Sequence, residues 1–169
     1  MSTPKLLKSL FQYKAWANEN LFFTLKTLDE TTHQAERHAA IRILNHIYVV
    51  DRIFAANLQG ISHEHTATNT PETPTIDSLH ASVRETDRWY LEYVAALSPQ
   101  ELSEDIDFSF VDGDPGRMSR EEILAHIVTH GGHHRGAVGR ILAQLSISSP
   151  RDIYSGFLHA SEPARRNRT

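Results

Sequence analysis

The 169-residue chain contains no cysteine, so it has neither a disulfide framework nor a thiolate that could bind a metal or attack a substrate. It also lacks any run of the roughly 20 consecutive apolar residues that span a bilayer. Its N-terminal segment has no long apolar stretch followed by a small-residue cleavage site, so no secretory signal is expected. We therefore expect a cytoplasmic protein with no membrane-spanning segment.

Positive charge is also scarce, because 17 lysines and arginines stand against 21 acidic residues and give a formal net charge of −4. A nucleic-acid-binding protein needs a basic surface to neutralise phosphates, so we expect no nucleic-acid partner. The one basic run is Arg165, Arg166 and Arg168. It predicts a disordered, solvated tail at 161–169, after a single domain at 1–160.

The spacing of apolar residues predicts four long helices, at about residues 4–28, 37–58, 76–97 and 120–145. The polar, proline-containing segment 61–75 predicts a long crossover connection. Alternating apolar residues and a glycine-rich turn predict a short hairpin-like excursion at 105–118. The expected fold is therefore all-α, a four-helix bundle with a long crossover and a hairpin before the last helix.

Histidine is abundant, with 11 residues in all and four between His126 and His134. A helix advances about 100° per residue, which places His130 and His134 on the apolar face and His126 and His133 at its edge. His46 shares the apolar face of another predicted helix. Two imidazoles four residues apart can bind one metal ion, and His46 supplies a third ligand.

A different interpretation of these histidines stays open on spacing alone. An inward-facing histidine is commonly a hydrogen-bonded core residue. Burying three imidazoles without partners would cost about 1 to 3 kcal/mol each. A metal ion removes that cost, and so does a buried polar network.

Four motifs together resemble the DinB/YfiT-like metalloenzyme superfamily over nearly the whole chain. They are YKAWAN at 13–18, NHIYVVDRIF at 45–54, HGGHHRGA at 130–137 and SPRDIY at 149–154. The resemblance implies a four-helix bundle, usually a homodimer, with a divalent metal held by His46, His130 and His134. One departure is Ala137, where the superfamily has a glutamine after the Arg-Gly pair.

An all-nitrogen ligand set favours zinc or nickel, with iron, manganese or copper also possible, over magnesium or calcium. Members of the superfamily include transferases that use a small thiol such as bacillithiol, mycothiol or glutathione. The resemblance therefore implies a metal-dependent thiol S-transferase that joins such a thiol to a small electrophile in detoxification or a stress response. The alternatives are a non-catalytic metal-binding dimeric stress protein and a metal-dependent hydrolase.

Two residues near His46 are candidate catalytic groups. Asp51, one turn beyond it, could orient a ligand or act as a base, and its alternative is a surface ion pair with Arg52 or another cation. Tyr48 is a candidate proton donor, and its alternative is packing. Arg135 is expected to point away from the ligands and to pair with acidic side chains.

Overall fold

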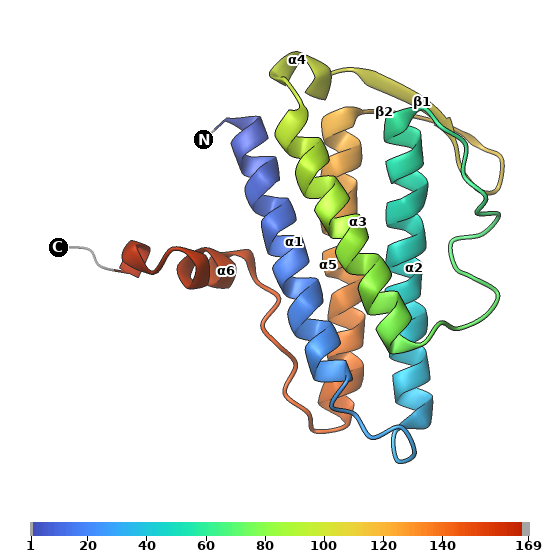
Figure 1. The fold of residues 1–169 in the computed structure, drawn as a ribbon, viewed down its shortest axis with the longest axis vertical. Coiled ribbons are helices and arrows are strands. Elements are labelled where there is room, and N and C mark those ends of the chain that lie inside the picture. Colours follow the sequence, from blue (N-terminus) through green and yellow to red (C-terminus); the bar gives the residue numbers. More distant parts are fainter. Residues whose placement is uncertain (1, 167–169) are drawn as a thin grey trace.

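The computed structural model describes residues 2–166. Four long helices lie side by side (Figure 1): α1 Thr3–Leu25, α2 Gln34–Gln59, α3 Ile76–Ala96 and α5 Arg120–Gln144. The shorter elements are α4 Pro99–Leu102, strands β1 Asp105–Ser109 and β2 Pro115–Ser119, α6 Tyr154–Ser161 and a 3-10 turn at Pro163–Arg166. The prediction of a mainly helical chain is confirmed.

Helix α3 packs against α1 and α2, and α5 packs against the same two helices from the other side. Helices α2 and α3 run in the same direction (Figure 1), so the chain between them has to return along the length of the stack. Residues 61–75 make that return as an irregular segment. This path brings polar main-chain groups past the middle of α2.

The core consists of two apolar clusters with a polar layer between them. One cluster packs Phe11, Phe54 and Tyr90 toward the α4 end of the stack. The other gathers residues further along α1 and α5 and earlier on α2 and α3, including Leu21 and Leu44. Between the two clusters along the helices lie buried charged and amide side chains: Lys14, Asn18, Asp51, Asp87 and Arg135.

The predicted hairpin is present, and strands β1 and β2 pair antiparallel with Phe108 opposite Gly116. Because Gly116 has no side chain, the Phe108 ring lies directly over it; a Cβ at Gly116 would be 2.5 Å from the ring. Gly113 makes the turn with φ of 92°, which glycine adopts without strain. Phe108 also packs edge-on against Phe54 of α2, with ring centroids 5.5 Å apart.

Helix α5 begins at the predicted capping box, in which the Ser119 hydroxyl accepts from the Glu122 N–H and the Glu122 carboxylate accepts from the Ser119 N–H. A second capping box, between Ser98 and Glu101, starts α4. The sequence predicted only a helix end at this Ser-Pro pair. Ser98 follows the end of α3 and at once caps a new helical turn, because Pro99 fits the first position of a helix.

The C-terminal segment returns to α1, where Phe157 of α6 packs on Tyr13 and Trp16. Helix α6 then projects away from the long helices (Figure 1). In the predicted tail, residues 163–166 form an exposed 3-10 turn, and residues 167–169 lie outside the described residues. Within residues 2–166, no helix combines the length and apolarity that crossing a membrane requires.

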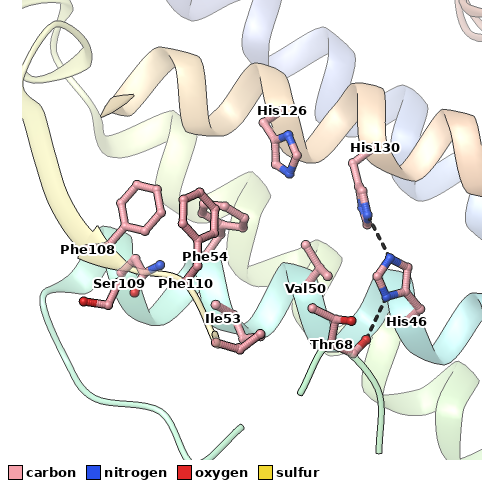
Figure 2. Close-up of a pocket in the computed structure, with 12 residues that line it drawn as sticks. His46, Val50, Ile53, Phe54, Thr68, Phe108, Ser109, Phe110, His126 and His130 are labelled. Atoms are coloured by element: carbon pink, nitrogen blue, oxygen red, sulfur yellow. Dashed lines mark hydrogen bonds between the residues drawn. The ribbon is translucent and has the colours of Figure 1, made fainter. Parts of the chain in front are cut away.

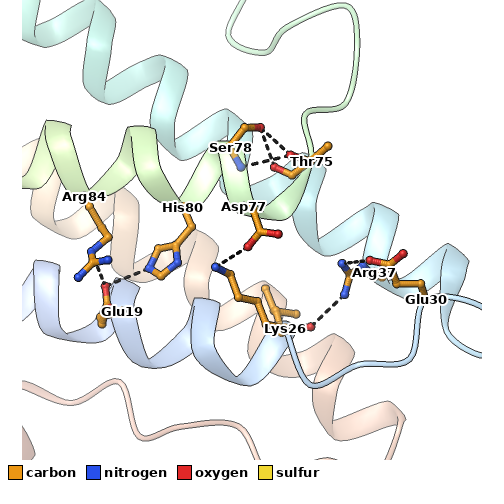
Figure 3. A network of polar contacts seen from close by, with 10 residues as sticks. Glu19, Lys26, Glu30, Arg37, Thr75, Asp77, Ser78, His80 and Arg84 are labelled. Carbon is orange, nitrogen blue, oxygen red and sulfur yellow. Dashed lines mark hydrogen bonds and ion pairs between the residues drawn. The ribbon is translucent and has the colours of Figure 1, made fainter.

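Surface ion pairs connect the end of α1 with the start of α3 (Figure 3). Lys26 Nζ lies 2.7 Å from the Asp77 carboxylate, whose side chain is 81% exposed. Glu19 accepts from His80 and lies 3.3 Å from Arg84. The exposed Lys26–Asp77 pair contributes little to stability, about 0 to 1 kcal/mol.

Candidate metal centre

The packing of α2 against α5 brings the three predicted ligands together. One ligand nitrogen from each of His46, His130 and His134 lies within 4.8 Å of the other two. The His134 ring centroid is 4.6 Å from that of His46 and 4.5 Å from that of His130. Two ligands come from successive turns of α5 and one from α2, so the cluster exists only when the helices are packed.

The nitrogen geometry fits a divalent metal ion. The Nε2 atoms of His46 and His130 are 3.1 Å apart, and two nitrogens bound about 2.1 Å from one ion are separated by about 3.0 to 3.4 Å. The Thr68 carbonyl lies 2.7 Å from His46 Nδ1. A carbonyl only accepts, so Nδ1 carries the proton and the Nε2 lone pair faces His130.

The charge state of the rings also suits metal binding. Burial, aided by the neighbouring imidazoles His134 and His46, lowers the pKa of His130 to about 3. Burial is the main cause that lowers the pKa of His134 and the sole cause that lowers that of His126. These rings are therefore neutral at neutral pH, the form in which imidazole binds metals.

A cavity of about 200 Å³ opens beside His46 and His130. Figure 2 shows His126 and His130 on α5, Val50 on α2, and Phe108 at the opposite end on the hairpin. Three protein ligands leave coordination positions free for water or substrate. Two of the three candidate ligands, His46 and His130, line the cavity, so a small molecule held there would lie beside an ion bound by the triad.

Comparison with known proteins places this arrangement in a family. A model described as the DinB family matches residues 1–166. The chain belongs to the DinB family. It is 23% identical to Protein DinB of Bacillus subtilis (strain 168) over 163 residues, which cover 88% of this chain and 91% of that protein. Membership of the DinB family and the histidine triad are together compatible with a metal-dependent protein.

In this DinB-family chain, the two predicted catalytic residues lie outside the cavity lining. Asp51 is 2% exposed, and its carboxylate lies 2.7 Å from Lys14 Nζ. Asp51 therefore lies neither beside a metal-ligating histidine nor in the surface ion pair that was its alternative. Burial raises the pKa of its carboxyl to about 6, although the positive charge of Lys14 acts to lower that pKa. Tyr48 packs against the apolar cluster around Leu44.

Residues from the four motifs that resemble the DinB/YfiT-like superfamily contact one another in the polar layer, and not only at the three histidines. Lys14 binds Asp51 and also Asp87, at 2.6 Å. Asn18 donates to Asp87 and accepts from Arg135. Arg135 in turn pairs with Asp152, which also accepts from Tyr13. The prediction that Arg135 pairs with an acidic side chain is confirmed.

Three residues of the site and of the polar layer were not assigned from the sequence, and only some of them follow a sequence pattern that could have identified them. Lys14 falls in the apolar stripe between Phe11 and Leu21, so a lysine at that position indicated a buried charge. His126 was placed at the edge of the apolar face, yet it lines the cavity. Thr68 had no pattern at all, because its main-chain carbonyl meets His46 only through the path of the crossover segment.

Proposed function

We propose that this protein is a metal-dependent thiol S-transferase built on a four-helix bundle. One observation carries the proposal: nitrogens of three imidazoles lie within 4.8 Å of one another, and on one side two of those rings, His46 and His130, line an apolar cavity. A purely structural polar network would fill that side with protein groups. An open ligand set beside a cavity is instead typical of a catalytic metal centre.

A bound divalent ion would lower the pKa of a small thiol so that it reacts as the thiolate. The chain's own groups hold and orient that reaction. His46, held by the Thr68 carbonyl, would present Nε2 to the ion. The cavity walls exclude water from the electrophile. In the reaction, the sulfur–carbon bond forms, the leaving group departs with its electron pair, and the thiol proton passes to solvent.

Alanine variants of the three candidate ligands test the metal assignment one residue at a time. His46→Ala, His130→Ala and His134→Ala should each weaken Zn²⁺ or Ni²⁺ affinity by more than about 100-fold, since removing a supporting group alone costs 10- to 100-fold. His133→Ala is the matched control, because His133 belongs to the same motif but is exposed. Elemental analysis and metal titration measure the effect. Equal affinity in all four variants would refute the centre.

Turnover assays then separate the reaction classes. Metal-loaded protein is given 1-chloro-2,4-dinitrobenzene with and without bacillithiol, mycothiol or glutathione, and product and chloride are followed. Thiol-dependent turnover lost in His130→Ala supports the transferase. Thiol-independent hydrolysis would indicate a hydrolase, and an occupied metal site without turnover on any tested electrophile would indicate a non-catalytic metal-binding stress protein.

A further inference from the structure

The cavity beside the triad has an apolar wall that the metal ligands do not explain. Val50, Ile53 and Phe54 supply it from α2, and Phe108 and Phe110 supply it from the hairpin (Figure 2). Phe110 is 46% exposed at the mouth. It packs edge-on against Phe108 but leaves much of its ring uncovered, and an apolar ligand in the cavity would cover more of it.

We propose that this cavity is the subsite for the electrophile, and that it selects an uncharged molecule with one aromatic ring and one hydrogen-bond acceptor. The inference rests on the proposed function for its orientation, with the reactive end of the molecule toward His46 and His130. The hairpin β1–β2 then acts as the specificity element, since it supplies one whole wall.

Size and charge set the class of ligand. A dry apolar cavity of about 150 Å³ holds a benzene molecule, so about 200 Å³ accommodates one substituted ring. Among the residues described, the lining includes no carboxylate, lysine or arginine. A charged ligand would lose its hydration without a counter-charge. Away from the metal ligands, the lining therefore disfavours thiols that carry carboxylates, which leaves this part of the cavity to the electrophile.

The acceptor requirement comes from Asn57, one α2 turn beyond Ile53 in the lining. Within residues 2–166, its amide Nδ2 is buried and has no hydrogen-bond partner. Buried amide donors are normally satisfied, and leaving one unpaired costs about 1 to 3 kcal/mol. If the Asn57 amide turns toward the cavity, a carbonyl or nitro oxygen on the ring would satisfy it.

Three probes of similar size test the proposal: acetophenone, ethylbenzene without the acceptor, and benzoate with a charge. Binding is measured by calorimetry and ligand-observed NMR on the full chain, before and after metal removal with a chelator. We expect acetophenone to bind both forms at least about fivefold tighter than ethylbenzene. Benzoate should bind weakest to the metal-free form, in which no cation offsets its charge. Asn57→Leu should abolish the preference for acetophenone over ethylbenzene.

Variants of the hairpin wall complete the test. Phe110→Ala should weaken acetophenone binding about five- to tenfold. Gly116→Ala should also weaken it, because the added Cβ displaces the Phe108 ring. Phe23→Ala, at a 74% exposed phenylalanine of α1, is the control and should change nothing. Circular dichroism checks that each variant folds.

The outcomes separate this inference from the metal proposal. If acetophenone binds to a chain that binds no metal, the subsite proposal stands and the transferase proposal fails. A second outcome is metal binding that depends on the triad but no acetophenone binding, or equal effects of Phe110→Ala and Phe23→Ala on that binding. It would overturn the subsite and leave the metal centre standing. Benzoate binding to the metal-free form as tightly as acetophenone would also overturn the subsite.

Discussion

At the scale of single residues, the site depends on which imidazole nitrogen carries a proton. The Thr68 carbonyl fixes the proton of His46 on Nδ1. Burial keeps His130 neutral, with its pKa lowered to about 3. His130 is thus already neutral before any ion arrives, and its binding to an ion at neutral pH releases no proton from an imidazolium.

This arrangement predicts an unusually acid-tolerant metal affinity. Protons compete with the ion, so affinity falls as pH falls. An imidazole with the ordinary pKa of about 6.5 would lower affinity about thirtyfold at pH 5, and three would give on the order of 10⁴-fold. Because His130 stays neutral until about pH 3 and the pKa of His134 is also lowered, we expect a much smaller decrease. Zn²⁺ titrations from pH 8 to pH 5 measure it, and a full 10⁴-fold loss would contradict the assignment.

At the scale of elements, helix positions followed from apolar spacing and from caps. The Ser119–Glu122 box was predicted and starts α5. The box at Ser98–Glu101 was missed because a four-residue helix has no apolar periodicity. The hairpin was predicted from alternation, but its part in the cavity wall was not.

The cap of α5 gives a prediction about stability without a change at the site. Ser119→Ala should lower the free energy of unfolding by about 1 kcal/mol. Metal affinity should be unchanged, because His130 lies three helical turns further along α5. Urea denaturation and metal titration measure both. Ser98→Ala removes the same kind of cap from the short α4 and should cost less; a loss of metal affinity in Ser119→Ala would show that the cap positions the ligands.

At the scale of the whole molecule, a charged layer crosses the stack between two apolar clusters. Lys14 of α1 binds Asp51 of α2 and Asp87 of α3. All three side chains are buried. Because a displaced helix would leave a buried charge unpaired, this layer fixes how the helices align and therefore the level at which His46 meets α5.

Removing the central cation should destabilise the fold strongly. Lys14→Met leaves two buried carboxylates without a counter-charge, and we expect the free energy of unfolding to fall by about 3 to 5 kcal/mol. Lys26→Met breaks the exposed pair with Asp77 (Figure 3) and should change it by about 1 kcal/mol or less. Urea denaturation at pH 7 compares them. Similar losses of unfolding free energy in Lys14→Met and Lys26→Met would mean that the buried charged layer stabilises the fold no more than an exposed ion pair does.

The sequence by itself determined the four long helices, the hairpin and the choice of His46, His130 and His134, because periodicity and spacing are local properties of the chain. It could not assign Asp51, which shares a motif with His46 but lies in the charged layer. Tertiary structure alone decided the partner of that carboxylate, the contact of Thr68 with His46, and the cavity between α5 and the hairpin. Each of these depends on segments distant in sequence, whose relative positions are set by packing and not by any pattern within one segment.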